Sequence, residues 1–416
     1  MNSFFVKYKF HFLILFLGLL WLFVLQFILQ IYSQNILYPD SFSYFEAAKN
    51  LYIFHRGHPY RPILLAFINK FPYLFGFEDL FIFKWSLLIN TICYLLSSLI
   101  LFKLLKQFLN QKSAFCFTLI FIFSVGTSAI VFHLLAENIY IFFLLLGFYF
   151  FLKYYNKNNF IYLSIALSIL ILSILIKPAS KFIAIIFLIY FFKILIFKYR
   201  SKAFFFIYIS VFAVFIQILG VKHQFGNYTI SYIDVVTFHN YIGSKAKCIE
   251  NNTTFIEKNN PRANFLFKYK VHQQNEIAKT DFINQIQNNK INLLIAYCAN
   301  ISENVNQGSL VILDCKNIKK TTYFENARSI LYNISVLQNL FLSIIGFILA
   351  IFFMFKNKKT NVFYGLVGFL IFYFELISGI SSDQGDRFSI VIYPFCILLT
   401  AKFLQEIKLF SAPLQK

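Results

Sequence analysis

Charged residues are scarce in this sequence, and acidic residues are the scarcest of them. Only 13% of the 416 residues are charged, with 17 Asp and Glu against 38 Lys and Arg, while 59% are hydrophobic. A soluble domain has about 45–50% apolar residues, so this composition excludes an ordinary soluble protein. Apolar runs of about 18 residues or more recur along the chain, which is typical of membrane-spanning helices. The sequence therefore predicts an integral membrane protein with several spans.

Alternating segments of about 10 residues, as in a transmembrane β-barrel, are also missing, which leaves an all-α polytopic fold. Glycine and proline are few, at 14 and 8, and no clear internal repeat is present. A transporter or flippase would show inverted repeats and Gly/Pro-broken helices in matching halves, so that class is disfavoured. The first apolar run, 10–32, is too long for a signal-peptide core of about 7–15 residues, and no small-x-small cleavage site follows it. We expect a retained first span.

The net charge of +21 does not point to nucleic acid. Basic residues that flank hydrophobic segments fix membrane topology and contact anionic lipid headgroups. The chain has no basic soluble domain with interleaved aromatic residues that would bind a nucleic acid. We therefore expect membrane lipids, and no nucleic acid, among its partners.

Hydropathy predicts about ten spans, at approximately 10–32, 80–102, 114–133, 138–152, 159–176, 182–197, 203–220, 334–355, 362–380 and 388–405. Short basic interruptions alternate with acidic or longer ones. The basic set comprises Lys103, Lys106, Lys112, Lys153, Lys157, Lys198, Arg200, Lys202, Lys356, Lys358 and Lys359. By the positive-inside rule this set faces the cytoplasm. With ten spans, both termini are cytoplasmic as well, in a multi-pass protein of the cell (inner) membrane.

The chain divides into three regions. They are a transmembrane catalytic core, 1–220, with a first outer loop at 33–79; an outer soluble segment, 221–333; and C-terminal transmembrane helices, 334–416. The outer segment is too long for a structureless loop. Within it, "NYTISYIDVVTFHNYI" has β character and "NEIAKTDFINQIQNNKINLLIAY" has helical periodicity near its end. We expect a small, partly ordered insertion that covers the outer face.

Three cysteines fall in the outer segment, Cys248, Cys298 and Cys315. An oxidising outer compartment would permit one disulfide among them. The sequence does not determine which pair would form it, and free buried thiols are the alternative.

Nearly all carboxylates fall on the predicted outer face. Besides those of the outer segment, they are Asp40, Glu46, Glu78, Asp79, Glu137, Asp383 and Asp386. Glu375 lies inside the ninth predicted span, in its outer half, and an acid within a span is usually functional or paired with a base. Acids contribute little to topology, so their placement predicts that the chemistry occurs at the outer face.

The first outer loop carries more polar chemistry than a connector needs. "YPDSFSYFEAA" predicts a helix start, with Asp40 or Ser41 as its N-cap. "RGHPYRPILLAF" adds Arg56, His58 and Arg61 to the same loop. An acid, a histidine and two arginines beside a membrane boundary indicate a candidate site.

His133 and Glu137 are four residues apart and would face one side of a helix that continued through both. Two such residues could contribute to a metal site, but no third ligand is obvious, and a hydrogen-bonded helix corner is the alternative. The sequence therefore predicts neither a metal site nor a cofactor, and leaves a divalent metal open.

Four motifs share the predicted outer face and follow one another from the first loop to the last span. They are "DSFSYFEA" with Asp40, Tyr44 and Ala47, "GHPYRPILLAF", "HLLAENIYIFFLL" with Glu137, and "RFSIVIYPFCILLTAKFL". In order, they are similar to a D-x-x-x-Y-x-x-A element, an R-x-P-type segment, a third-to-fourth-span corner and a late Arg-Phe/Tyr…Pro span. In these motifs the chain resembles the GT-C superfamily of multi-span glycosyltransferases, most closely the bacterial group related to protein mannosyltransferases and the lipid A aminoarabinose transferase.

The resemblance implies a GT-C-like enzyme that moves a sugar from a polyprenyl-phosphate donor to an acceptor hydroxyl at the outer leaflet, usually with inversion. The acceptor could be a lipid, a glycan or a protein. Asp40 would be the catalytic base, and partial desolvation at the membrane boundary would raise its basicity. The leaving phosphate would need positive charge beside it.

The candidate ligands of the donor phosphate are Arg61, Lys177 and Arg387, all near the outer surface in this topology. A local pair with Asp383 or Asp386 is the alternative for Arg387. The supporting residues would be Tyr44, His58, Glu137 and Glu375.

An O-antigen polymerase or ligase is the second candidate function, since it also combines many spans with one long outer segment late in the chain. Such an enzyme would depend on Arg and His in that late segment. Here the acid and the arginines concentrate in the first loop, which favours the glycosyltransferase.

Overall fold

The fold is helical, and the part of the chain that the structure describes contains no strand. The computed structural model describes residues 2–31, 38–257, 260–313, 315, 321–356 and 362–409. The start of the first outer loop and two members of the predicted cytoplasmic set, Lys358 and Lys359, lie outside these residues.

Within the described part of the chain, five helices are long and apolar enough to cross a membrane. They are α1 (Asn2–Leu29), α4 (Asp79–Leu105), α7 (Glu137–Lys157), α11 (Phe205–Phe225) and α18 (Thr322–Phe355). Three bent pairs raise the number to eight if each pair is one span. The first pair is α5 (Gln111–Ile122) with Val125–Phe132, which includes α6 (Val125–Ala129), and it is bent by 62°. The second pair is α9 (Ser180–Tyr190) with α10 (Phe192–Lys198), bent by 65°. The third pair is Gly385–Val391 with α20 (Tyr393–Glu406), bent by 53°.

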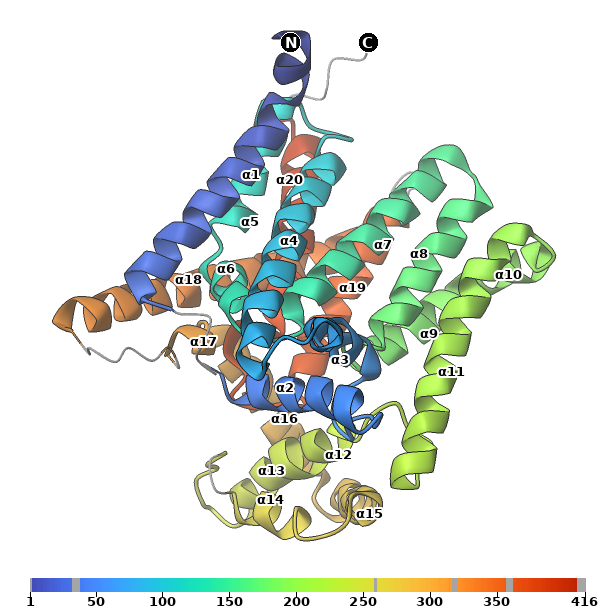
Figure 1. The fold of residues 1–416 in the computed structure, drawn as a ribbon, viewed down its shortest axis with the longest axis vertical. Helices are drawn as coiled ribbons and strands as arrows, with labels where there is room; N and C mark the ends of the chain where they lie inside the picture. Colours follow the sequence, from blue (N-terminus) through green and yellow to red (C-terminus); the bar gives the residue numbers. More distant parts are fainter. Residues whose placement is uncertain are drawn as a thin grey trace.

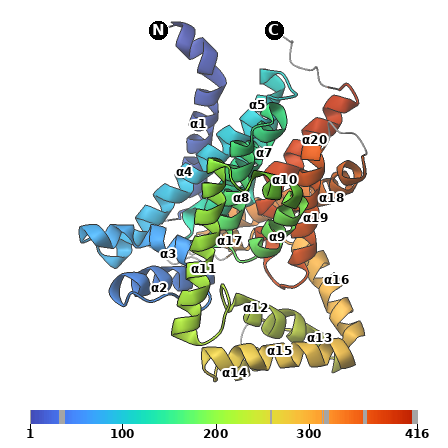
Figure 2. The ribbon, with the colours of Figure 1, turned by 90° about the vertical axis from the view of Figure 1, so that its right-hand side faces the viewer.

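The ten predicted spans all contain helix, but their number as crossings stays a prediction. Helices α8 (Phe160–Ser173) and α19 (Val362–Ser378) have 14 and 17 residues, about 21 and 25 Å at 1.5 Å per residue, whereas the hydrocarbon core is about 30 Å thick. Helix α18 runs across α1 rather than alongside it (Figures 1 and 2), so its length alone does not establish a crossing. The apolar helices nevertheless identify an all-α, membrane-embedded protein.

A layer of short helices lies at one end of the bundle (Figure 1). Helix α1 begins and α20 ends at the opposite end of the bundle. The layer of short helices and these two helix ends therefore mark opposite ends of the bundle. The helical layer spans 233–288 and comprises α12 (Ile233–Val235), the π-helix Val236–Gly243, α13 (Ser244–Glu250), α14 (Pro261–Leu266) and α15 (Val271–Asn288). Helix α11 leads into it, and α16 (Lys290–Asn306) leads out of it (Figure 2). Helices α2 (Pro39–Ile53) and α3 (Ile63–Asn69) lie between the layer and the bundle.

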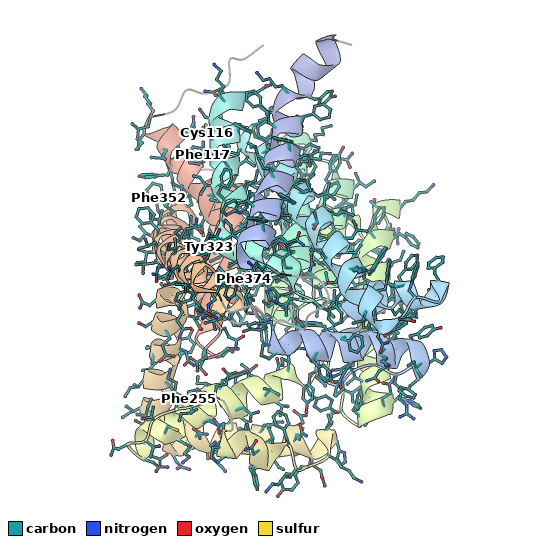
Figure 3. The ribbon with its side chains drawn as sticks, turned by 60° about the vertical axis from the view of Figure 1, so that its left-hand side comes forward. Cys116, Phe117, Phe255, Tyr323, Phe352 and Phe374 are labelled. Carbon is teal, nitrogen blue, oxygen red and sulfur yellow. The ribbon has the colours of Figure 1, made fainter. Side chains whose placement is uncertain are left out.

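Aromatic side chains hold the bundle together. Phe148 of α7 packs edge-on against Phe187 of α9, Phe363 of α19 and Phe395 of α20, with ring centroids 5.9, 6.2 and 5.0 Å apart. Edge-on aromatic pairs at such distances contribute about 0.5–1.5 kcal/mol each beyond the burial of area. Figure 3 shows this crowding of rings through the bundle. Phe148 thus joins α7 to three helices that are distant from it in sequence.

Two buried asparagines fix the turn that precedes α20. The Asn339 amide on α18 donates to the carbonyls of Asn304 and Gln307, both at 2.7 Å. The Asn304 amide donates in turn to the carbonyls of Ser378 and Ser381, at 3.0 and 2.8 Å. Carbonyls at helix ends need partners when no water reaches them. The two amides supply these partners and so lock the end of α16 against the end of α19.

The stretch 227–242 contains turns and helices, so the β character predicted for it is wrong. Tyr232 and Val235 pack with Leu266 and Ala278 into a small apolar core of the helical layer. Burial between helices outweighs the intrinsic preference of these side chains for strands. The helical periodicity predicted for 275–297 is confirmed by α15 and α16.

The helices that flank the predicted outer segment extend into it from both sides. Helix α11 continues to Phe225 and α18 begins at Thr322, against predicted limits of 221 and 333. Among the described residues no disulfide links Cys248, Cys298 and Cys315 to one another. Cys315 is buried, whereas Cys298 is exposed.

A topology test follows from the two different ends of the bundle. In a variant with Cys116, Cys248 and Cys298 replaced by serine, Asn251→Cys in the helical layer should react with an impermeant thiol reagent applied to intact cells. Gln107→Cys, in the turn between α4 and α5 at the opposite end, should react only after permeabilisation. Both positions are exposed, so accessibility in the folded protein does not bias the comparison. The reverse labelling pattern would place the helical layer on the cytoplasmic side.

Candidate active site

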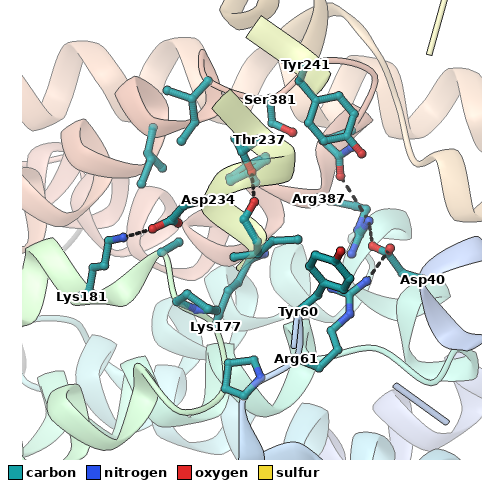
Figure 4. A pocket seen from close by; sticks show the side chains of 18 of the residues that line it. Asp40, Tyr60, Arg61, Lys177, Lys181, Asp234, Thr237, Tyr241, Ser381 and Arg387 are labelled. Carbon is teal, nitrogen blue, oxygen red and sulfur yellow. Dashed lines mark hydrogen bonds and ion pairs between the residues drawn. The ribbon is translucent and has the colours of Figure 1, made fainter. Parts of the chain in front are cut away.

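A pocket lies where the first outer loop, the N-terminus of α7 and the helical layer meet (Figure 4). Its charged lining comprises Asp40, Arg61, Glu137, Lys177, Lys181, Asp234 and Arg387. Its apolar lining includes Phe182, Ile233, Phe238, Ile377, Ile380 and Phe388. The pocket therefore combines a charged region with an apolar wall.

Asp40 lies in the first turn of α2, with its side chain turned to the pocket. Its Oδ1 accepts a hydrogen bond from Arg61 Nη2 at 2.6 Å, and its Oδ2 accepts one from Arg387 Nη1 at 2.7 Å (Figure 4). The N-cap of α2 is Tyr38, and no side chain caps this helix. The prediction of Asp40 or Ser41 as N-cap is therefore wrong, because the carboxylate is committed to two guanidinium groups instead.

Arg387 bridges two carboxylates from distant parts of the chain. Besides its bond to Asp40, its Nη2 and Nε donate to Glu137 Oε1 at 2.9 and 3.2 Å. The side chain is only 7% exposed. The alternative of a local pair with Asp383 or Asp386 is wrong, since the guanidinium points toward α2 and α7.

A tight turn aims Arg387 into the pocket. Gly385 has a φ of +55°, and a Cβ there would lie 2.4 Å from the carbonyl oxygen of Gly308. The Asp386 backbone N–H donates to that same carbonyl at 3.2 Å, and the Gln384 N–H donates to the Asn304 side chain at 3.2 Å. Only glycine fits this left-handed, crowded position without strain. The sequence "SSDQGDR" thus forms the turn that places the guanidinium.

Arg61 is held by its neighbours in the first outer loop. Its Nε donates to Ser43 Oγ at 2.8 Å, and its guanidinium stacks over the Tyr44 ring at 4.3 Å. The same turn is tied to the helical layer, because Ser231 Oγ donates to the Tyr60 carbonyl at 2.8 Å. The layer and the first loop therefore position this arginine together.

The centre of the pocket has an excess of positive charge. Lys177 Nζ donates to Glu137 Oε1 at 3.3 Å, so this carboxylate serves both Lys177 and Arg387. Counting Arg61, Lys177 and Arg387 against Asp40 and Glu137 gives +3 − 2 = +1. Glu137 is 1% exposed, and the three cations are 7–17% exposed. Buried charge is stable only when it is compensated, so an anion would complete this cluster.

The expectation that desolvation raises the basicity of Asp40 is wrong. Burial does favour the neutral acid, but the charges of Arg61 and Arg387 and their hydrogen bonds outweigh it and hold the pKa of Asp40 well below its usual range. At neutral pH Asp40 is thus an ionised anchor for two arginines rather than a free base.

Two of the predicted site residues lie outside the pocket. His58 has a side chain that is 9% exposed, with its Nε2 4.0 Å from Glu46. Burial, and then the nearby charge of Arg61, lower the pKa of His58 to about 4, so it is neutral at pH 7. Glu375 lines a separate, apolar cavity with Ser343 and Phe347. Neither residue lines the pocket that holds the arginines.

The chain does not continue as one helix through His133 and Glu137. His133 is extended, with φ −106° and ψ 149°, and α7 begins at Glu137. The two side chains therefore do not share a helix face, because the condition of a continuous helix is not met. Within the described residues, no group of three His, Cys, Asp or Glu side chains is placed to hold a metal ion.

Several pocket residues were not predicted from the sequence. Lys181 of α9 forms an ion pair with Asp234 of α12 on the far side of the pocket from Asp40 (Figure 4). Tyr241 of the π-helix lines the pocket, and Gln384 accepts a hydrogen bond from Arg387 at 3.2 Å. Asp234 and Tyr241 belong to the helical layer, where no local pattern marks them. Gln384 lies three residues before Arg387, and this short spacing is the one feature of the sequence that could have indicated Gln384 as a site residue.

Glu137→Gln should destabilise the protein, because it leaves Lys177 without its carboxylate and Arg387 with only Asp40. Removing one partner of a buried ion pair costs about 3–5 kcal/mol. We expect the thermal unfolding temperature in detergent to fall by several degrees. The control is Glu46→Gln, whose carboxylate is 45% exposed beside a neutral histidine and should change stability by about 1 kcal/mol or less. Equal unfolding temperatures for the two variants would show that Glu137 does not support the cluster.

Comparison with models of known protein families finds no match, and comparison with curated proteins finds none either. The interpretation of the pocket therefore rests on its geometry and charge, together with the four motifs that resemble GT-C enzymes.

Proposed function

We propose that the pocket is the active site of a membrane glycosyltransferase, which moves a sugar from a polyprenyl-phosphate donor to an acceptor hydroxyl. One observation carries the proposal: the largely buried cluster around Arg387 has an uncompensated positive charge. Arginine forks bind phosphate oxygens in pairs, and lysine adds a point charge. The order of the four motifs along the chain supports the same function.

The apolar wall of the pocket suits the lipid part of such a donor. Phe182, Ile377 and Ile380 belong to the apolar lining of the pocket. Phe182 is 50% exposed at the surface of α9, where a prenyl chain could continue into the bilayer. Apolar side chains gain about 25 cal/mol for each Å² that a lipid chain removes from water. A polar sugar nucleotide would leave this wall unused.

The reaction would use the cluster to stabilise the leaving group. The acceptor oxygen forms a bond to the anomeric carbon while the bond from that carbon to the phosphate oxygen breaks. The electron pair leaves with the polyprenyl phosphate, and Arg61, Lys177 and Arg387 face the charge that develops there. The acceptor proton passes to a carboxylate. The acceptor, a lipid, a glycan or a protein, would reach the pocket from the outer face.

Asp40 would organise this site by holding its two arginines. Without a donor, it occupies the N–H groups of Arg61 and Arg387 that would bind a phosphate. A donor phosphate would compete for the same N–H groups, so the arginines need no large movement to accept it. This preorganisation lowers the cost of aligning charge during the reaction.

An O-antigen polymerase or ligase fits the pocket less well. That function was expected to depend on Arg and His of the late outer segment. The described residues of that segment that line the pocket are Ile233, Asp234, Thr237, Phe238 and Tyr241, which include neither. The basic side chains come from the first loop, the 174–181 region and the turn before α20.

The direct test of the function is mass analysis of cell-envelope glycolipids and glycoproteins with and without this protein. A glycosyltransferase of this kind should leave its lipid-linked sugar unused when it is absent, and one glycan product should disappear. No change in any lipid-linked sugar or glycan would contradict the proposal.

Arg61→Gln should weaken the binding of undecaprenyl phosphate to the protein in nanodiscs at least tenfold, because it removes one guanidinium fork. Arg61→Lys should bind in between, since it keeps the charge without the fork. Arg262→Gln is the control, because Arg262 pairs with Asp281 at 2.6 Å in the helical layer, outside the pocket. If Arg61→Gln and Arg262→Gln bind the lipid equally well, Arg61 is not a phosphate ligand.

Asp40→Asn should abolish transfer while the protein remains in the membrane. The amide cannot bind two guanidinium groups as a carboxylate does, so the arginines lose their common anchor, and we expect a loss of about 10²-fold or more. Transfer is measured in cells as recovery of the missing glycan. Asp79→Asn is the control, since Asp79 pairs with Lys49 at 2.7 Å at the start of α4 and does not line the pocket. Full recovery with Asp40→Asn would remove Asp40 from the site.

A further inference from the structure

The proposed reaction needs a proton acceptor, and the two carboxylates of the cluster are poorly placed for it. Both oxygens of Asp40 accept hydrogen bonds from guanidinium groups at 2.6 and 2.7 Å. Glu137 is 1% exposed, and its Oε1 is shared by Lys177 and Arg387. A carboxylate that is engaged by cations is a weak base, and a fully buried one is out of reach of an acceptor.

A third carboxylate, that of Glu257, is hydrogen-bonded to a residue that lines the pocket. Glu257 lies in the loop between α13 and α14 of the helical layer, and its residue surface is exposed. Its carboxyl shares a hydrogen bond with the hydroxyl of Tyr241, whose side chain lines the pocket near Arg387 (Figure 4). No Lys, Arg or His of the described residues forms an ion pair with it. Glu257 is therefore exposed, and none of the described cations holds its carboxylate.

We propose that Glu257 is the base that takes the proton of the acceptor hydroxyl and that Tyr241 positions it. This inference rests on the proposed glycosyl transfer and deepens it. As the acceptor oxygen bonds to the anomeric carbon, its proton passes to a Glu257 oxygen, and the carbon–phosphate oxygen bond breaks toward Arg387 and Arg61. Charge is conserved, because the carboxylate becomes neutral while the phosphate gains one negative charge.

The electrostatics around Glu257 suit a general base. The pKa of Glu257 is raised to about 7, chiefly by partial desolvation and also by the charges of Asp383 and Asp40, while the hydrogen bond from Tyr241 and the charge of Arg387 oppose the rise. A base is most effective when its pKa lies near the working pH. The proton therefore has an acceptor that is ionised above about pH 7 and that is not held by an arginine.

The position of Glu257 also separates the routes of the two substrates. The apolar lining of the pocket includes Phe182 and Ile377, along which a prenyl chain would lie. Glu257 belongs to the helical layer, which lies beyond α2 at the end of the bundle. An acceptor that arrives from the aqueous side would meet Glu257 and Tyr241 before it meets the phosphate-binding arginines.

The test compares Glu257→Gln with Glu250→Gln, an exposed glutamate of the same layer that pairs with Lys247 at 2.8 Å. Membranes from the source cells supply the native donor and acceptor, and consumption of the lipid-linked sugar is followed by mass spectrometry. Glu257→Gln should slow transfer at least 100-fold, while its affinity for undecaprenyl phosphate in nanodiscs stays within twofold of wild type. Normal lipid affinity also shows that the variant is folded. Glu250→Gln should match wild type in both measurements.

Two further variants distinguish a base from a structural residue. Glu257→Asp keeps the carboxylate and should retain more transfer than Glu257→Gln. Tyr241→Phe should slow transfer about tenfold, because a positioned hydrogen bond is lost while the base remains. In wild type the rate should fall as the pH drops below about 7, where Glu257 becomes protonated. That decline should be absent in Glu257→Gln. The other groups that face this carboxyl, Tyr241, Asp383, Asp40 and Arg387, remain in that variant.

The inference is overturned if Glu257→Gln transfers at the wild-type rate with the wild-type pH dependence while wild type binds undecaprenyl phosphate and consumes the donor. In that case the proposed function stands and another group is the base. If wild type itself neither binds undecaprenyl phosphate nor consumes a lipid-linked sugar, the proposed function fails and the assignment of Glu257 fails with it.

Discussion

The buried guanidinium of Arg387 connects the parts of the molecule on which the candidate site depends. It bonds to Asp40 at the start of α2 and to Glu137 at the start of α7, and it is itself carried by the turn before α20. These three segments are separated by about a hundred residues or more of chain, and helix packing alone would not fix their relative positions to within a hydrogen bond. Removing the positive charge would leave two carboxylates facing each other in a buried space. The same interaction therefore holds the fold together locally and creates a site that can bind an anion.

The turn that carries Arg387 is held by amides rather than by packing. Asn304 and Asn339 together donate to carbonyls at the ends of α16 and α19, where a bilayer offers no water to replace them. Interhelical bonds of this kind stabilise membrane proteins by about 0.6 kcal/mol on average, so their number matters more than any single one. Their combined effect is to make the 379–385 region rigid. A rigid turn keeps the long arginine side chain in one place without a substrate.

Much of this arrangement could be predicted from the sequence, and the reasons for the failures are physical. Hydropathy located the ten helical segments, because an apolar run is a local property of the chain. Asp40, Arg61, Lys177, Arg387, Tyr44 and Glu137 were predicted as site residues and do meet in one pocket. Glu375 and His58 were also predicted as site residues because they are polar and near the outer face, but both lie outside the pocket. Which side of a helix faces the pocket depends on packing between segments distant in sequence, which a single sequence does not encode locally. Tyr241 was missed for the same reason, since the fold of the helical layer brings it to the pocket.

The balance of charge in the pocket narrows the class of molecule that fits it. Lys181 and Asp234 neutralise each other on one side, whereas the cluster around Arg387 keeps one positive charge unmatched. A neutral ligand would leave that charge uncompensated, and a strongly polar anion would leave the wall of Phe182, Ile377 and Ile380 in contact with water. A molecule that is anionic at one end and apolar along the rest would satisfy both regions at once. A prenyl phosphate that carries a sugar has this distribution of charge and apolar surface. The pocket would thus select a donor that has both a negative charge and an apolar chain. A donor with only one of them would leave either the positive charge or the apolar wall without a partner.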